Sequence, residues 1–168
     1  GKINVIQIDH LTSMPAWFGD TFSVDQYRFA RAYGGGAIMD MGVHDFDGVR
    51  FMLQREIVEV FALGGPISFP CDVDDSAVVL FQMQGSVLGT LGLSFDTPGG
   101  GSFVRFHGSQ GTLVVKQKAQ ANSGYLQVWL DGVWKEYEIE PQNPYEAEIN
   151  PMVSNTFMLI LPRCSTEQ

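Results

Sequence analysis

Between residues 57 and 139, apolar residues recur at every second position, in short segments separated by turn residues. A period of two is the pattern of a β-strand with one buried face, so each segment predicts a strand. Asp131-Gly132 is the strongest of several hairpin signals, and hairpins join antiparallel neighbours. The predicted strands are Lys2–Leu11, Ile57–Leu63, Ser76–Met83, Val87–Phe95, Phe103–His107, Thr112–Lys116, Tyr125–Leu130 and Trp134–Ile139.

Helical spacing is confined to two other stretches. Over residues 37–53 the apolar residues recur three and four positions apart, which predicts an amphipathic helix. A closing helix is predicted over residues 144–160, with Pro151 as a break or kink. The aromatic-rich segment 12–33 shows neither period, and we expect it to be irregular.

Strands and helices are segregated along the chain, so the predicted fold class is α+β, a large and mostly antiparallel sheet with helices on one face. The other face must then be polar or meet a partner. Apolar residues in two central strands indicate that it is not wholly polar, which favours homo-oligomerisation through the sheet. These residues are Val78, Leu80, Val87, Leu91 and Leu93.

The composition is that of a single globular domain spanning residues 1–168, with 45% apolar and 17% charged residues. Its 10 basic and 19 acidic residues give a net charge of −9, without a Lys/Arg cluster, which argues against nucleic acid and anionic membranes as partners. No apolar run reaches the roughly 18 residues of a membrane span. Two distant cysteines, Cys71 and Cys164, form no zinc motif, and without a signal peptide they fit a cytoplasmic protein.

A glycine triplet leads into the first predicted helix, and that helix carries acids around a histidine. Asp40 and His44 are four residues apart and Asp47 follows after three more, so a regular helix places them on one side. A nearby carboxylate can orient an imidazole and raise its basicity for general-base catalysis. The same set could make purely structural contacts, or bind a metal, for which one helix face offers at most three ligands. We predict no metal site.

The glycines at 35 and 36 could admit a ligand close to the backbone, because no Cβ stands in the way, or could simply form a turn. Trp17 belongs to an aromatic-rich segment that packs in the core or lines a pocket. We take Gly35, Gly36 and Trp17 as candidate substrate contacts. The paired acids Asp74 and Asp75 predict a solvated strand start, with substrate or partner contact as the alternative.

Other catalytic motifs are absent from the sequence, including GxSxG, GxxxxGK[ST] and HExxH. No GxGxxG follows a strand, and the βαβ alternation of a dinucleotide fold is missing. We therefore expect no dinucleotide-binding domain and no cofactor site in this chain.

The order of several motifs resembles the C-terminal domain of the Gfo/Idh/MocA oxidoreductases, the group of glucose–fructose oxidoreductase and inositol dehydrogenase. The run Gly34–Asp47 is similar to the family signature GGGxxxDxGxHxxD, and Asp74–Ala77 is similar to its DD[ST]A strand start. The resemblance implies a fold like the C-terminal domains of dihydrodipicolinate reductase and glyceraldehyde-3-phosphate dehydrogenase. Further matching segments, in the family's order, are Lys2–Leu11, Gly85–Thr90, Phe106–Leu113 and Tyr145–Ile149.

Full enzymes that this chain resembles place a Rossmann domain first, where NAD or NADP binds beside a lysine. The resemblance implies that His44 takes the hydroxyl proton of a sugar or polyol while a hydride leaves its carbon. It also implies that Asp40 orients or contacts the same substrate, and that Asp47, a further candidate contact, mainly supports the helix. The chain contains neither the cofactor half nor its lysine, so we expect no redox turnover from it alone. A separate Rossmann-domain chain is a candidate partner.

The sequence supports two hypotheses about function, which belong to different classes. The first is the substrate-binding and oligomerisation domain of an NAD(P)-dependent sugar or polyol oxidoreductase. The alternative is a stand-alone, non-catalytic module that binds a small molecule or dimerises. A hydrolase or isomerase built on His44 is disfavoured, because the sequence shows no nucleophile or oxyanion arrangement.

Overall fold

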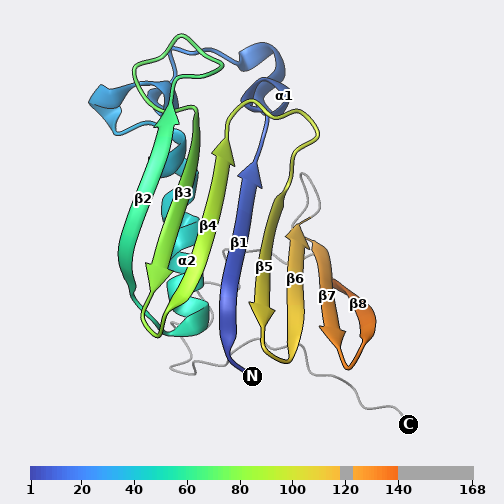
Figure 1. Cartoon of the computed structure of the whole chain (residues 1–168). Coiled ribbons are helices and arrows are strands. Elements are labelled where there is room, and N and C mark those ends of the chain that lie inside the picture. The colour runs from blue at the N-terminus through green and yellow to red at the C-terminus, as the bar shows by residue number, and fades with distance from the viewer. Residues whose placement is uncertain (118–122, 140–168) are drawn as a thin grey trace, which may run out of the picture.

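The computed structural model describes residues 1–117 and 123–139, which form an eight-stranded sheet with helical segments on one face (Figure 1). Neighbouring strands are antiparallel except for β1 and β4, which run parallel. The predicted α+β class, with a mostly antiparallel sheet, is confirmed. The strands are β1 Ile3–Leu11, β2 Ile57–Gly65, β3 Ser76–Met83, β4 Val87–Ser94, β5 Ser102–Gly108, β6 Gly111–Gln117, β7 Gly124–Leu130 and β8 Val133–Ile139.

The strand order is β2-β3-β4-β1-β5-β6-β7-β8, so the first strand of the chain occupies the middle of the sheet. Val5 of β1 pairs with Leu88 of β4 on one side and with His107 of β5 on the other. Two antiparallel groups, β2–β4 and β5–β8, are therefore joined through β1. The backbone hydrogen bonds of β1 form a parallel ladder with β4 and an antiparallel ladder with β5.

The predicted first helix is present but begins irregularly. Residues Ile38–Gly42 form a π-helical stretch, and the regular helix α2 runs from Val43 to Leu53. A π-helical turn holds more residues than an α-helical turn, so Asp40 does not take the angular position that a uniform α-helix predicts. Such turns are frequent at functional sites.

The segment expected to be irregular contains a short helix, α1 (Met14–Phe18), and three 3-10 turns. The N-terminus of α1 is capped, since the Ser13 hydroxyl accepts a hydrogen bond from the Ala16 N–H at 3.3 Å. Pro15 stands within the first helical turn, where the missing N–H costs nothing. These two residues are the local signal for α1 that the periodicity did not reveal.

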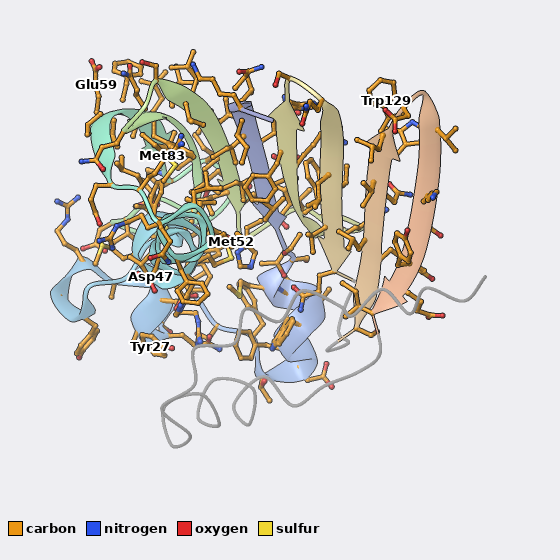
Figure 2. All side chains as sticks on the ribbon, turned by 90° about the horizontal axis from the view of Figure 1, so that it is seen from below. Tyr27, Asp47, Met52, Glu59, Met83 and Trp129 are labelled. Atoms are coloured by element: carbon orange, nitrogen blue, oxygen red, sulfur yellow. The ribbon has the colours of Figure 1, made fainter. Side chains whose placement is uncertain are left out.

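The hydrophobic core lies between α2 and the central strands. Figure 2 shows Met83 of β3 between the sheet and α2, while Glu59 and Trp129 project from the other side of the sheet. The strands alternate accordingly: along β4 every second residue is buried, and the residues between are partly or fully exposed. The largest fully buried side chains are those of Phe95, Ile6, Ile8, Met83, Leu91, Val49, Val87 and Asp75.

The open face of the sheet is apolar over β2–β4, although only partly through the residues that we predicted. Val87, Leu91 and Leu93 are buried, because their register with β3 turns them toward α2, so that part of the prediction is wrong. Val78 and Leu80 do lie on the open face and are exposed. We call the exposed apolar group on this face the open-face patch, formed by Phe61, Leu63, Val78, Leu80 and Leu88.

The predicted closing helix and Cys164 lie outside the described residues. Among the helices that are described, none has both the length and the apolar character to cross a membrane.

Candidate functional site

The glycine turn before α2 is saturated with hydrogen bonds from the chain itself. The N–H groups of Gly35 and Gly36 donate to carbonyls of the preceding segment at 3.1 and 2.8 Å. The next two, of Ala37 and Ile38, donate to the Asp74 carbonyl at 2.7 Å and to the Asp74 carboxylate at 2.8 Å. A phosphate binds at such a turn through free N–H groups. Here they are occupied, in part by a carboxylate that would repel it, so this turn does not fit a dinucleotide.

Contacts within the chain also account for the two glycines. A Cβ on Gly35 would lie 2.4 Å from the carbonyl oxygen of Arg28, and one on Gly36 would lie 2.5 Å from Asp74 Oδ1. Gly36 has a φ of +117°, a conformation that residues with a Cβ rarely adopt. The role of both glycines as substrate contacts stays a prediction, since close packing already requires glycine at these positions.

Asp75 is fully buried, so the prediction of a solvated strand start is wrong for this residue. Its carboxylate accepts three backbone hydrogen bonds from the connection between β2 and β3, from Ile67 at 3.0 Å, Ser68 at 2.8 Å and Phe69 at 2.7 Å. Asp74, its neighbour, fixes the start of the helical stretch. The paired acids therefore hold two segments in place: Asp74 holds the glycine turn before α2, and Asp75 holds the connection between β2 and β3.

Asp40 is held by an arginine that the sequence reasoning did not identify. Arg28 Nε donates to Asp40 Oδ2 at 3.0 Å, and both side chains are mostly buried, at 26% and 20% exposure. The Arg28 guanidinium lies 4.6 Å from the ring centroid of Tyr27 and 5.6 Å from that of Phe18. Ion pairing and stacking together fix the guanidinium and balance the charge of Asp40.

His44 is exposed on α2 and forms no hydrogen bond or ion pair within the described ranges. Asp40 therefore does not orient its imidazole in this structure, because the Asp40 carboxylate is directed to Arg28. Asp47 is 79% exposed and points away from the sheet, as Figure 2 shows. The three residues share a helix but no direct contact, and their role at a substrate site stays a prediction.

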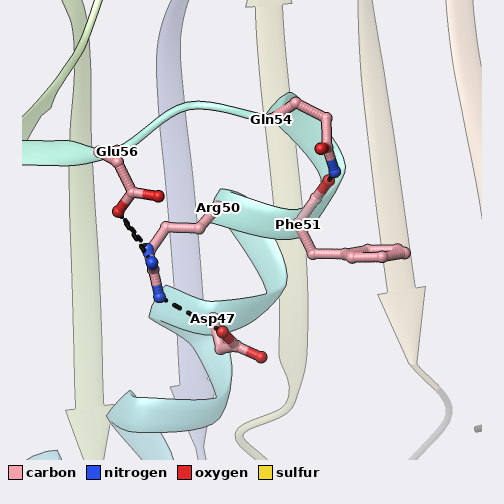
Figure 3. A network of polar contacts seen from close by, with 5 residues as sticks. All are labelled: Asp47, Arg50, Phe51, Gln54 and Glu56. Atoms are coloured by element: carbon pink, nitrogen blue, oxygen red, sulfur yellow. Dashed lines mark hydrogen bonds and ion pairs between the residues drawn. The ribbon is translucent and has the colours of Figure 1, made fainter.

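Asp47 belongs instead to a surface network on the outer side of α2 (Figure 3). Arg50 reaches Glu56 at 2.8 Å and Asp47 at 3.4 Å. The hydrogen bond that Arg50 donates to the Glu56 carboxylate raises the pKa of the Arg50 guanidinium and lowers the pKa of the Glu56 carboxyl. This network ties the end of α2 to the residue before β2, and the role of Asp47 stays a prediction.

A second imidazole does have a carboxylate partner. His10, near the end of β1, places Nδ1 at 3.0 Å from Oδ2 of Asp45 on α2, and the side chains are 31% and 15% exposed. The two residues are 35 positions apart, so their contact depends on the folded arrangement of β1 and α2. No sequence spacing indicated this pair.

Trp17 is 62% exposed on α1, and the structure gives it no ring contact with another described aromatic residue. Its substrate role is untested. Across residues 1–117 and 123–139, no three His, Cys, Asp or Glu side chains converge as metal ligands would.

Comparison with known proteins gives a family match over most of the described chain. The family model described as the GFO/IDH/MocA C-terminal domain matches residues 1–114. The myo-inositol 2-dehydrogenase of Thermotoga maritima is 39% identical over 62 residues, which are 34% of this chain and 18% of that protein.

Two solved structures share the fold. The aldose–aldose oxidoreductase of Caulobacter crescentus, complexed with glycerol, superposes with a TM-score of 0.74 at 19% identity, covering 92% of this chain and 47% of that one. An inositol dehydrogenase homologue from Azotobacter vinelandii, complexed with NAD+, superposes with a TM-score of 0.67 at 19% identity. The match covers 82% of this chain and 37% of that one. The chain thus spans less than half the length of each of these proteins.

Proposed function

The chain belongs to the GFO/IDH/MocA family as one of its C-terminal domains, and from that premise we propose that it is the substrate-binding and oligomerisation domain of a cytoplasmic NAD(P)-dependent sugar or polyol oxidoreductase. The observation that carries this proposal is the fixed Asp40, held by Arg28 within one helical turn of an exposed histidine, His44. A partly buried ion pair beside a solvent-accessible base suits a polar, uncharged ligand such as a polyol.

The nicotinamide cofactor would be bound by another part of the enzyme, since the saturated glycine turn does not fit it, and it would supply the hydride acceptor. In this proposal the imidazole of His44, which bonds no other described residue, accepts the proton of a substrate hydroxyl. Asp40 accepts a hydrogen bond from a neighbouring hydroxyl through lone pairs that Arg28 leaves free. Arg28 holds the Asp40 carboxylate in place, so this side chain loses little conformational entropy when substrate binds.

The test is polyol binding by the full chain, measured by isothermal titration calorimetry with myo-inositol, glycerol and levoglucosan as probes. His44→Asn should weaken the best binder about tenfold or more, the effect of losing a hydrogen bond in a binding site. His107→Asn is the matched control, because His107 lies on the open face and bonds Gln7 and Thr112. Absence of binding by all probes, or equal binding by the His44 variant, would reject the proposal.

The alternative, a stand-alone module without catalysis, predicts a different outcome. It predicts binding or dimerisation that is insensitive to both His44→Asn and Asp40→Asn. A polyol that binds equally to the chain and to both variants would support this alternative.

Oligomerisation is the second part of the proposal, supported by the open-face patch. Five exposed apolar side chains on adjacent strands form a surface that monomeric proteins usually cover. Light scattering after size exclusion should give a dimer or larger species, and Leu80→Glu should convert it to a monomer. Val43→Glu is the control, because Val43 is also exposed but lies on α2. A monomeric parent chain would contradict this part of the proposal.

A further inference from the structure

The imidazole of His10 has a defined tautomer. An ionised carboxylate can only accept hydrogen bonds, so the 3.0 Å contact with Asp45 Oδ2 requires the proton on His10 Nδ1. In the neutral ring the other nitrogen, Nε2, then carries the lone pair and is the basic atom. Nε2 has no hydrogen-bond partner among the described residues, and about a third of the side chain is exposed.

The pair lies directly beside the proposed site. Asp45 follows His44 in α2, and consecutive Cα atoms are about 3.8 Å apart. Asp45 and Met52 are two helical turns apart and share one side of α2. Figure 2 shows Met52 on the side of the helix nearest β1, the strand that carries His10. His44 and the His10–Asp45 pair therefore occupy adjacent sides of the same helical turn.

We propose that His10 Nε2 is a second substrate contact, which accepts a hydrogen bond from a hydroxyl other than the reacting one. The inference rests on the proposed function and assigns to this pair a second hydroxyl group of the sugar or polyol substrate. Asp45 is a positioning residue, because it fixes the tautomer that leaves Nε2 free to accept. A purely structural pair would need the same Nδ1 contact but would not distinguish between ligand hydroxyls.

The first experiment tests the tautomer by 15N NMR of the histidine side chains in the full chain. We expect His10 to have Nδ1 protonated and Nε2 unprotonated near neutral pH. Asp45→Asn is nearly isosteric and can keep the tie between β1 and α2, but its amide can donate to Nδ1 and so move the proton to Nε2. A ring of His10 protonated at Nε2 in the parent chain would overturn the proposal.

The second experiment adds myo-inositol and follows both imidazoles. We expect the Nε2 signal of His10 to shift on binding, together with that of His44. His10→Gln should weaken myo-inositol binding about tenfold, and removing one particular hydroxyl from the ligand should abolish the difference between variant and parent. This selectivity for one hydroxyl is a readout that lost packing alone would not give.

The outcomes separate the two proposals. If myo-inositol perturbs His44 but leaves His10 unchanged, the second contact is rejected and the proposed function stands. If His10→Gln weakens every deoxy analogue equally, the pair is structural and the inference fails. If no polyol perturbs either imidazole, both proposals fall together.

Discussion

Replacing Asp75 with alanine should destabilise this fold more than any other single change of an acidic residue in the described chain. The carboxylate is completely buried and accepts three backbone hydrogen bonds of 2.7 to 3.0 Å. A hydrogen bond to a charged group contributes about 1.5–3 kcal/mol, and the three are not additive because they share one carboxylate. Since the released N–H groups can in part reach water, we expect the free energy of unfolding to fall by about 3–5 kcal/mol.

Urea unfolding of the chain, followed by tryptophan fluorescence and circular dichroism, measures this loss. Hydrogen exchange gives an independent local readout, because the N–H groups of Ile67, Ser68 and Phe69 should lose protection together. Asp75→Asn should cost less than Asp75→Ala, since its amide oxygen can still accept two hydrogen bonds.

Asp72→Ala provides the matched control. Asp72 is exposed, and its carboxylate accepts one backbone hydrogen bond, from the Arg31 N–H at 2.8 Å. Its loss should cost about 1 kcal/mol or less. If Asp75→Ala costs no more than this control, the reasoning that the buried carboxylate holds the loop is refuted.

Two further predictions concern the start and the end of the helical stretch. Gly36→Ala should lower the melting temperature much more than Gly34→Ala. The new Cβ at position 36 would collide with Asp74, whereas at position 34 no atom lies within 4 Å and only the cost of a φ of +73° remains. Equal shifts in melting temperature would contradict this. Arg50→Gln should return the lowered pKa of Glu56 toward its ordinary value of 4.5, measured by NMR titration of the side-chain carboxyl. Because that pKa is lowered in the folded state, the pair stabilises the protein above pH 4.5, and the stabilisation is lost as the pH falls through the lowered value. A pKa of Glu56 that is the same in both proteins would rule this out.

The strands were predictable because their signal is local. The turn at Asp131-Gly132 joins β7 and β8 as expected, with both residues at positive φ, and the predicted strand bounds agree with the structure within two residues. Alternation of side chains requires no knowledge of the partner strand. The order of strands was not predictable in this way, since nothing in the segment 2–11 indicates that it pairs with β4 and β5.

The errors on the open face have the same origin. Leu91 and Leu93 alternate as correctly as Val78 and Leu80, but a period of two does not say which alternate set faces the helix. The register between β3 and β4 decides this, and it places Leu91 opposite the buried Val79.

The candidate site was predictable only along one helix. Helical spacing indicated Asp40, His44 and Asp47. The residue that holds Asp40 and the histidine that pairs with Asp45 come from other segments of the chain. Arg28 stands before the glycine turn and His10 stands on β1, so both contacts need the folded chain. The identity of these partners shows that carboxylate contacts at the site are set by tertiary structure.

The central position of β1 has a consequence for how the protein is made. This strand leaves the ribosome before both of its neighbours, because its partners Leu88 and His107 are translated about 80 to 100 residues later. At roughly 5–20 residues per second, its apolar side chains stay unpaired for on the order of 5 to 20 seconds on the nascent chain. The β2–β4 hairpins can form during that interval, but they then present an unfilled strand edge until β1 docks. Chaperone dependence during synthesis should therefore be concentrated in this interval and should end once β5 has emerged.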